Sequence, residues 1–344
     1  MRALIFPGPA RAEVQEVAAP RAGDGEVVVD VERAGVCGTD VELFGGTLSY
    51  VRDGVTRYPI RPGHEWCGRV RAVGAGVDRS WLGRRVTADT MLGCGRCPAC
   101  RRGRHHVCPD RTEIGIRGDQ PGALAEQLAV PAVALHALPE GLSPAAGALV
   151  EPGGTALRAV RAASLTGGEK LLVLGAGTLG LLTAAFAGVH GARVNVADPR
   201  PEALALVARY GATAVPLAEL GDEPAYDVVV DASTGAGSPG RAVRLVEPAG
   251  RVVLAGLSST PSTLDTRDLV FADLTVVGLL GASAGLDGVI AAYTAGEVVP
   301  DDLVAAVVGL DEVSDVLAGR RPTGAGPGPK VQVDPHRGGR GGPS

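Results

Sequence analysis

The stretch from residue 170 to residue 198 constrains the fold of this chain most. It reads KLLVLGAGTLGLLTAAFAGVHGARVNVAD: an apolar strand, a G-x-G-x-x-G turn, an apolar helix and a second strand ending in Asp198. In such a turn the first glycine permits the bend, the second lets the backbone approach a pyrophosphate, and the third packs the helix on the strand. The order of elements predicts a dinucleotide-binding βαβ unit, whose candidate cofactor-binding residues are Gly175, Gly177, Thr178, Leu179, Gly180, Asp198 and Arg200.

Asp198 bears on the choice of cofactor. A carboxylate at the end of the second strand accepts hydrogen bonds from the adenosine ribose hydroxyls and repels a 2′-phosphate. NAD is therefore the expected cofactor. NADP is the alternative, because Arg200 lies two residues further on and would meet a 2′-phosphate.

The length and the patterning indicate two domains in a chain of 344 residues. Strands rich in Val, Leu and Ala alternate with helices after residue 170, which indicates a parallel sheet covered on both faces. Residues 1–142 instead hold short strands separated by Gly and Pro, as in an irregular antiparallel barrel. We expect the dinucleotide-binding domain over 143–290, a C-terminal segment over 291–334 and a disordered tail over 335–344.

Four cysteines lie in the predicted lobe 93–109, with the spacing C-x2-C-x2-C-x7-C. A reducing compartment argues against disulfides, and a thioredoxin-like pair needs two cysteines in a βαβ setting rather than four in a loop. An iron–sulfur cluster stays open, because ferredoxin-type runs also place three cysteines at two-residue intervals. The spacing best fits a closed structural zinc site with the ligands Cys94, Cys97, Cys100 and Cys108.

A second set of metal-ligand residue types is spread over two motifs. Cys37 follows a strand expected at about 26–36, and His64–Glu65 precede a strand expected at about 66–73. Catalytic zinc uses such mixed sulfur, nitrogen and oxygen ligands and keeps one position for substrate or water. Each residue alone is more often a core cysteine or a hydrogen-bonded histidine, so only the combination suggests a site.

Composition argues against several classes of partner. The net charge is −5, so no general attraction to nucleic acid or to an anionic membrane is expected. No run approaches eighteen apolar residues, and the apolar stretch at the start is too short for a secretory signal, so we expect a cytoplasmic protein. Lysine occurs only at positions 170 and 330, which we attribute to coding bias rather than to function.

Together these motifs resemble one known family. GVCGTD, PGHEWCGRV, the four-cysteine lobe, ALVEP and GAGTLG occur in the order found in zinc-dependent medium-chain dehydrogenases/reductases of the alcohol dehydrogenase superfamily, from Met1 to about Asp334. CGTDVE, GHEW and VEP lean toward the polyol, sugar and threonine dehydrogenase branch. The resemblance implies an α/β protein with a GroES-like β-barrel catalytic domain and a doubly wound parallel-sheet Rossmann domain. It also implies that the C-terminal segment returns to the catalytic domain.

The resemblance also implies roles for single residues. Cys37 and His64 would be zinc ligands, Glu65 a ligand or a neighbour of the metal, and Glu151 the remaining ligand. Thr39 would pass on the substrate proton. Glu42 stands where many relatives carry a relay histidine, and Glu113 matches a glutamate that holds substrate hydroxyls in sugar dehydrogenases. For both glutamates a solvated loop carboxylate is an equal alternative.

The expected function is a zinc-dependent, NAD(P)-linked interconversion of a secondary alcohol and its ketone, with two zinc ions per chain. The substrate would be a polyol, sugar or cyclitol; a β-hydroxy amino acid such as threonine is the alternative. A non-catalytic zinc-ribbon protein that senses NAD would not need Cys37, His64 and Glu151 together. A zinc-free reductase would lack both the lobe and the G-H-E motif. Relatives in this branch are commonly tetramers built on a dimer, and we expect a homo-oligomer here, a homotetramer ahead of a homodimer.

Overall fold

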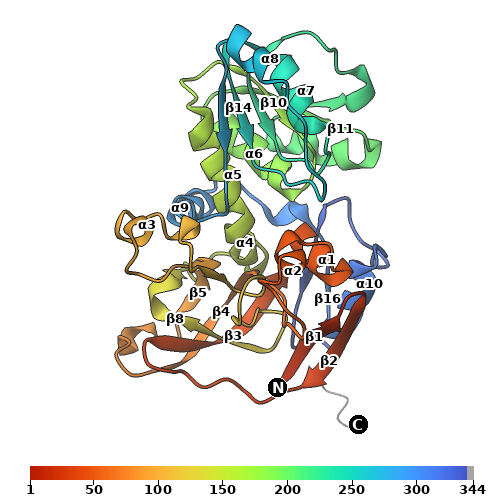
Figure 1. The fold of residues 1–344 in the computed structure, drawn as a ribbon. Coiled ribbons are helices and arrows are strands. Elements are labelled where there is room, and N and C mark those ends of the chain that lie inside the picture. The colour runs from red at the N-terminus through yellow and green to blue at the C-terminus, as the bar shows by residue number, and fades with distance from the viewer. Residues whose placement is uncertain (339–344) are drawn as a thin grey trace. The chain divides into compact units, whose positions relative to one another are not determined.

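A computed structural model describes residues 1–338 of the chain. They form two compact units (Figure 1). The first contains residues 1–151, 299–326 and the described chain from 330 onward; the second contains 152–298 and 327–329. The predicted boundaries at 142/143 and 290/291 therefore lie too early. Helix α4 (Pro144–Ala148) packs on three strands of the first unit, and α9 (Leu286–Ala295) extends past the second predicted boundary.

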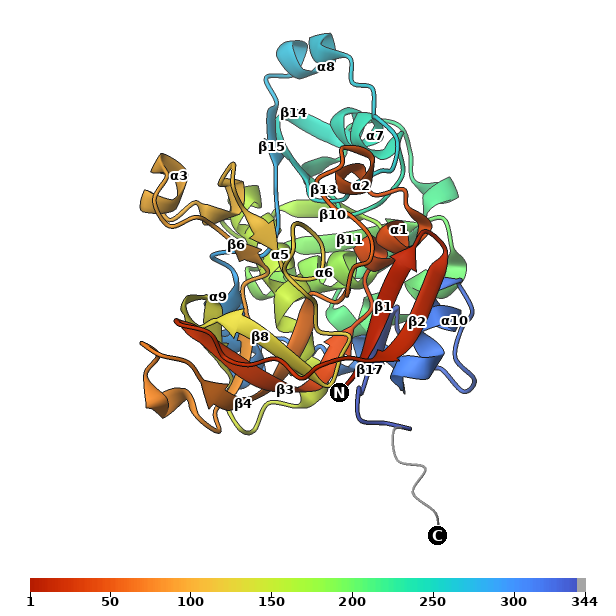
Figure 2. The same ribbon diagram turned by 60° about the horizontal axis from the view of Figure 1, so that its bottom comes forward.

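The first unit is built around a mostly antiparallel sheet. Its strands run in the order β16-β17-β3-β4-β5-β9, and β8 pairs with β3. The C-terminal strand β17 lies antiparallel to β3, with Val333 opposite Ala34 (Figure 2). These strands are β3 (Glu26–Gly35), β4 (Glu65–Val73), β5 (Arg85–Ala88), β8 (Gln127–Pro131), β9 (Leu135–Ala137), β16 (Val304–Val308) and β17 (Lys330–Val333).

Smaller elements complete this unit. A hairpin joins β1 to β2, and a two-residue ladder joins β6 to β7. The bounds are β1 (Arg2–Gly8), β2 (Arg11–Glu16), β6 (Met91–Leu92), β7 (Thr112–Glu113), α1 (Gly38–Gly45), α2 (Ser49–Arg52), α3 (Pro98–Arg101) and α10 (Val313–Leu317).

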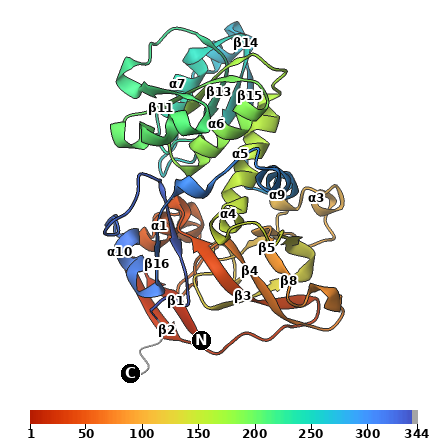
Figure 3. The same cartoon turned by 180° about the vertical axis from the view of Figure 1, so that it is seen from behind.

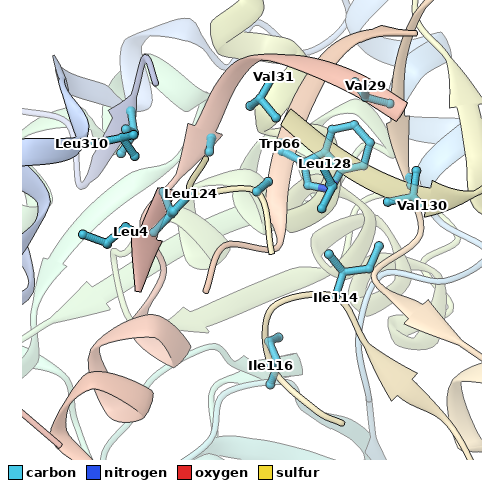
Figure 4. Close-up of a cluster of buried hydrophobic side chains, with 14 of the residues drawn as sticks. Leu4, Val29, Val31, Trp66, Ile114, Ile116, Leu124, Leu128, Val130 and Leu310 are labelled. Carbon is cyan, nitrogen blue, oxygen red and sulfur yellow. The ribbon is translucent and has the colours of Figure 1, made fainter. Parts of the chain in front are cut away.

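The core of the first unit explains why the C-terminal segment belongs to it. Val29 and Val31 of β3 pack with Trp66 of β4, and Leu310 from the far end of the chain joins the same buried cluster (Figure 4). A fully buried aliphatic or aromatic side chain contributes about 1.5–3 kcal/mol relative to exposure. Residues 335–338, predicted as part of the disordered tail, form a turn instead, because Asp334 accepts from the backbone N–H of His336 at 3.0 Å. The rest of the predicted tail lies outside the described residues.

The second unit is a doubly wound parallel sheet. Its strand order, β12-β11-β10-β13-β14-β15, reverses direction between β10 and β13, which is the crevice where open α/β sheets bind dinucleotides. Helices α6 and α7 pack against it (Figures 1 and 3). The bounds are β10 (Lys170–Leu174), β11 (Arg193–Asp198), β12 (Thr213–Pro216), β13 (Tyr226–Asp231), β14 (Val246–Leu254), β15 (Thr275–Gly278), α5 (Val150–Ala163), α6 (Thr178–Val189), α7 (Ser238–Leu245) and α8 (Thr266–Phe271), with a 3-10 helix over Pro201–Tyr210. The predicted α/β class is confirmed.

Candidate functional site

The four cysteines of the lobe converge on one point. The Sγ atoms of Cys94, Cys97, Cys100 and Cys108 all lie within 4.8 Å of one another. Cys97 caps α3 by accepting from the Cys100 N–H at 3.4 Å, and Gly95 and Gly103 adopt left-handed conformations with φ of 72° and 70°. The backbone N–H groups of Arg96 and Cys97 lower the pKa of Cys94 to about 6. Four converging sulfurs with a stabilised thiolate fit a tetrahedral zinc ion.

Cys37, His64 and Glu65 form a second group. One ligand atom from each lies within 4.8 Å of the other two. The pairing of β3 with β4 places Gly35 opposite Glu65, which brings the end of one strand to the start of the other. His64 and Glu65 are 5 % and 1 % exposed, whereas Cys37 is half-buried. Sulfur, imidazole and carboxylate donors suit zinc, and we call these three residues the metal group.

Asp40 supports the metal group and was missed by the sequence analysis. It is fully buried on α1, accepts from the Cys37 N–H at 2.9 Å, and its second oxygen lies 3.6 Å from Nδ1 of His64. A carboxylate behind a ligating histidine fixes the tautomer and the ring orientation. The signal was present in the sequence, because Asp40 stands at the third helical position after Cys37.

Lys330 is the second residue that the sequence analysis missed. Its Nζ donates to both carboxylate oxygens of Glu65, at 2.7 and 2.8 Å, and to the carbonyl of Val36 at 3.0 Å. All three N–H donors are thus used in a site that is 4 % exposed. Burial alone would lower the pKa of Lys330, but Glu65 raises it by more, so the ammonium stays charged. Coding bias accounts for the rarity of lysine but not for this position.

Three further residues were predicted for the catalytic site: Glu151, Thr39 and Glu42. Glu151, in the first turn of α5, is not among the three converging side chains, although burial raises its pKa to about 7 and the charge on His64 opposes that rise. The hydroxyl of Thr39 lies 4.0 Å from the Cys37 sulfur. Glu42 is half-buried on α1, and burial raises its pKa. The roles of all three stay predictions.

Glu113, predicted to hold substrate hydroxyls, already accepts hydrogen bonds from the protein itself. It is 3 % exposed on β7, and its Oε1 accepts from Arg111 Nε at 2.8 Å and from the Tyr50 hydroxyl at 3.1 Å. One carboxylate oxygen is therefore already occupied by two donors. Whether Glu113 also contacts substrate stays a prediction.

The glycine-rich turn of the second unit forms a cradle. Gly175 has φ of +102°, and a Cβ on Gly180 would lie 1.8 Å from the Gly175 carbonyl oxygen, so neither position tolerates a side chain. A Cβ on Gly177 would meet nothing within 4 Å, which leaves space beside the N-terminus of α6, where Thr178 and Leu179 begin the helix. This geometry fits a pyrophosphate facing the helix dipole.

Asp198 and Arg200 line the same cavity, which has a volume of about 640 Å³. Asp198 accepts from the backbone N–H of Ala176 at 2.9 Å and from Arg200 Nε at 3.0 Å. Burial acts to raise the pKa of Asp198, but Arg200 and the backbone N–H groups lower it by more. The carboxylate is therefore ionised, with Arg200 as its partner, and its binding of a ribose stays a prediction.

Comparisons with known proteins agree with this geometry. Residues 23–140 match the alcohol dehydrogenase GroES-like domain, and residues 178–294 match the zinc-binding dehydrogenase family. L-threonine 3-dehydrogenase from Pyrococcus horikoshii is 34 % identical over 282 residues, 78 % of this chain and 80 % of that protein. 2-Dehydro-3-deoxy-L-galactonate 5-dehydrogenase from Pseudoalteromonas atlantica is 32 % identical over 311 residues, 87 % of this chain and 89 % of the relative.

A solved structure has the same fold as this chain. An alcohol dehydrogenase from E. coli CFT073 in complex with NADH superposes with a TM-score of 0.87 at 28 % identity, over 97 % of this chain and 99 % of that one. Within residues 1–338, no helix is long and apolar enough to span a bilayer. The two matched domains, the relatives and the two converging ligand groups lead to one conclusion: the chain is an enzyme that belongs to the zinc-dependent medium-chain alcohol dehydrogenase family.

Proposed function

We propose that this enzyme oxidises a secondary alcohol of a polyol, sugar or cyclitol to the ketone, with NAD as the hydride acceptor. The proposal depends mainly on one observation, the convergence of Cys37, His64 and Glu65. The same unit also contains Glu113, whose carboxylate is buried and accepts from Arg111. Per turnover the alcohol loses a hydride to NAD and a proton to solvent, which leaves a ketone, NADH and a proton. When bound, zinc supplies a Lewis acid for the substrate oxygen, and the nicotinamide supplies the hydride acceptor.

Side chains of the protein would bind the metal and transfer the substrate proton. Cys37, His64 and Glu151 would hold the metal, and Asp40 would orient His64. Both oxygens of Glu65 accept from Lys330, so we assign Glu65 to the surroundings of the metal rather than to direct ligation. Thr39 would take the substrate proton and Glu42 would pass it on; burial raises the pKa of Glu42, which makes it a better base than a solvated glutamate.

The cofactor and the metal content are part of the proposal. Asp198 supports NAD over NADP because its ionised carboxylate would repel a 2′-phosphate, although Arg200 beside it reduces that repulsion. Two zinc ions per chain are supported by the two separate ligand groups among the described residues. All six cysteines are free, which suits the reducing cytoplasm.

Assembly is also proposed. β15 lies at the edge of the six-stranded sheet, where unpaired backbone groups can pair with a second copy. Val270 and Phe271, just before this strand, are 76 % and 86 % exposed. Large exposed apolar side chains beside an open edge support a homodimer or a homotetramer.

Threonine-type oxidation is the second candidate, because the relative from Pyrococcus horikoshii acts on L-threonine at position 3. One panel separates the two candidates: sorbitol, glucose, myo-inositol and L-threonine, each with NAD and NADP, followed by absorbance of the reduced cofactor. We expect activity with polyhydroxylated alcohols and NAD. Activity confined to L-threonine would establish the alternative. Cys37→Ser is the control; it should stay folded, retain one zinc and lose activity.

A further inference from the structure

One hydrogen bond joins the cysteine lobe to the rest of the first unit, and the proposed chemistry does not use it. His105 lies between the lobe ligands Cys100 and Cys108, and its Nε2 is 2.7 Å from Oδ2 of Asp89. The carboxyl group belongs to a residue that is 6 % exposed, whereas His105 is half-buried. A carboxylate in such a place is costly unless a donor faces it. The lobe therefore supplies Asp89 with a donor.

The fold of the lobe determines where His105 lies. A Cβ on Gly93 would lie 2.7 Å from Sγ of Cys100 and 2.7 Å from Cβ of His105, so the sulfur and the histidine pack against the same glycine. The carbonyl of His105 accepts from the N–H of Cys108 at 2.9 Å. Because metal ligands surround it on both sides, His105 keeps its place only while the lobe stays ordered.

The segment around the buried carboxylate holds the backbone of the metal group. The Thr90 hydroxyl donates to the carbonyl of His64 at 3.2 Å, and the Thr87 hydroxyl donates to the carbonyl of Trp66 at 2.7 Å. Both threonines are buried, at 3 % and 1 % exposure. The two bonds lie on either side of Glu65, so this segment fixes the backbone of two members of the metal group.

The side chain of Asp89 anchors that segment. Its Oδ1 accepts from the Met91 N–H at 3.0 Å, while its Oδ2 faces His105. Contacts thus run without a break from the lobe through His105, Asp89 and Thr90 to His64, all within the first unit. Energetic coupling between two sites passes through contiguous contacts of this kind.

We propose that His105 and Asp89 are positioning residues through which the ordered lobe holds His64 in place for metal binding. The metal group then retains its ion more strongly while the lobe is intact. This inference rests on the proposed function, which makes Cys37 and His64 zinc ligands. It gives the lobe a second role, because groups behind a ligating histidine typically change metal affinity by about 10–100-fold.

Zinc release to a chromogenic chelator, from the zinc-loaded protein, tests the inference. Cys37→Ser shows the release from the lobe alone, so the remaining signal belongs to the metal group. His105→Leu, which removes the donor, should speed release from the metal group at least tenfold, and His105→Gln, which keeps an N–H donor, should do so less. Thr90→Val removes the bond to the His64 carbonyl and should speed release from the metal group without loosening the lobe. Arg104→Gln, at an exposed arginine of the lobe, should change neither site.

Two further measurements separate positioning from a loss of stability. In the cobalt-substituted protein, the visible bands of the metal group, taken as the difference from Cys37→Ser, should shift in His105→Leu while the lobe stays resistant to trypsin. Asp89→Asn should also speed zinc release, and the double variant with His105→Leu should release zinc no faster than the more severe single variant, because both substitutions break one contact.

Failure of this inference differs from failure of the proposed function. If His105→Leu and Asp89→Asn leave release from the metal group unchanged, or if only the lobe loses zinc faster, the inference is overturned and the proposed function stands. If both substitutions speed release from the metal group but no alcohol of the panel reduces NAD or NADP in the unmodified protein, the proposed function is wrong and the inference stands.

Discussion

At the scale of single residues, the pair Glu65–Lys330 decides how much charge surrounds the metal group. Both side chains are buried, and each polar atom of the pair has a partner. A buried carboxylate is costly unless it is paired and hydrogen-bonded, so Lys330 permits Glu65 to stand beside Cys37. It also adds a positive charge that partly offsets the anionic ligands.

Lys330→Met should lower the free energy of unfolding by about 3–5 kcal/mol, because it leaves Glu65 charged and unpaired in the interior. Denaturant titration measures the change. The chain provides a matched control in its other lysine: Lys170 is exposed, so Lys170→Met should cost less than about 0.5 kcal/mol. Equal effects of the two substitutions would show that the buried ion pair does not matter for stability.

At the scale of elements, we expect the cysteine lobe to depend on a bound metal for its order. Its helix α3 has four residues, and of its four cysteines Cys108 alone is buried, so apolar burial contributes little to its order. A segment of this kind gains its folding free energy from metal binding.

Cys97→Ser should therefore release one zinc per chain and loosen the lobe. Arg101, Arg102 and Arg104 are exposed there and offer cleavage sites for trypsin. We expect rapid cleavage within the lobe of the variant, mapped by mass spectrometry. Cys37→Ser should also lose one zinc but keep the lobe resistant. Equal resistance in both variants would mean that the lobe is ordered without zinc.

The turn before β10 predicts a dependence of stability on pH. The side chain and backbone of Thr166, with the Gly167 N–H, donate to Glu169 and lower its pKa to about 2 from an ordinary value of 4.5. A carboxyl group with a depressed folded-state pKa stabilises the fold above the unfolded value, and this contribution is lost as pH falls from 4.5 toward 2.

Glu169→Gln tests that dependence. Because solvent screens this partly exposed group, the variant should be less stable by under about 1 kcal/mol at pH 7. The difference between the two proteins should disappear as pH falls toward 2, as followed by denaturant or thermal unfolding. A difference that stays constant from pH 7 to pH 2 would show that the charge of Glu169 has no part in it.

At the scale of the whole molecule, association should depend on the exposed apolar residues beside the edge strand β15. Phe271→Asp places a charge at the proposed contact and should shift the assembly toward monomers, as measured by light scattering at micromolar concentration. Leu82→Asp, at an exposed leucine of the first unit, should leave the assembly unchanged. A wild-type monomer under these conditions would contradict the proposed assembly.

Much of the fold and of the site could be predicted because the decisive patterns are local. The glycine turn spans Gly175 to Gly180, and the sulfur ligands lie between Cys94 and Cys108, so short-range spacing alone specifies both. The alternation of strands and helices after residue 170 likewise predicted the parallel sheet that the structure contains. The domain boundaries were less accurate. Helix α4 belongs to the first unit because it packs on the sheet of that unit, and the sequence of the helix does not show which sheet it will contact.

The sequence by itself therefore determined the family, the cysteine lobe and the nucleotide cradle, since each depends on residue types at short fixed intervals. Tertiary structure alone decided which polar side chains meet. Glu65 and Lys330 are 265 positions apart, and Tyr50 and Arg111 are 61 apart. The first pair meets because β17 and β4 both pair with β3. The second meets because the loop after the lobe contacts the segment after α2, where Thr56 donates to the carbonyl of Ile116. Polar contacts at such separations have no sequence period, so only the packed fold brings Lys330 to Glu65 and Arg111 to Tyr50.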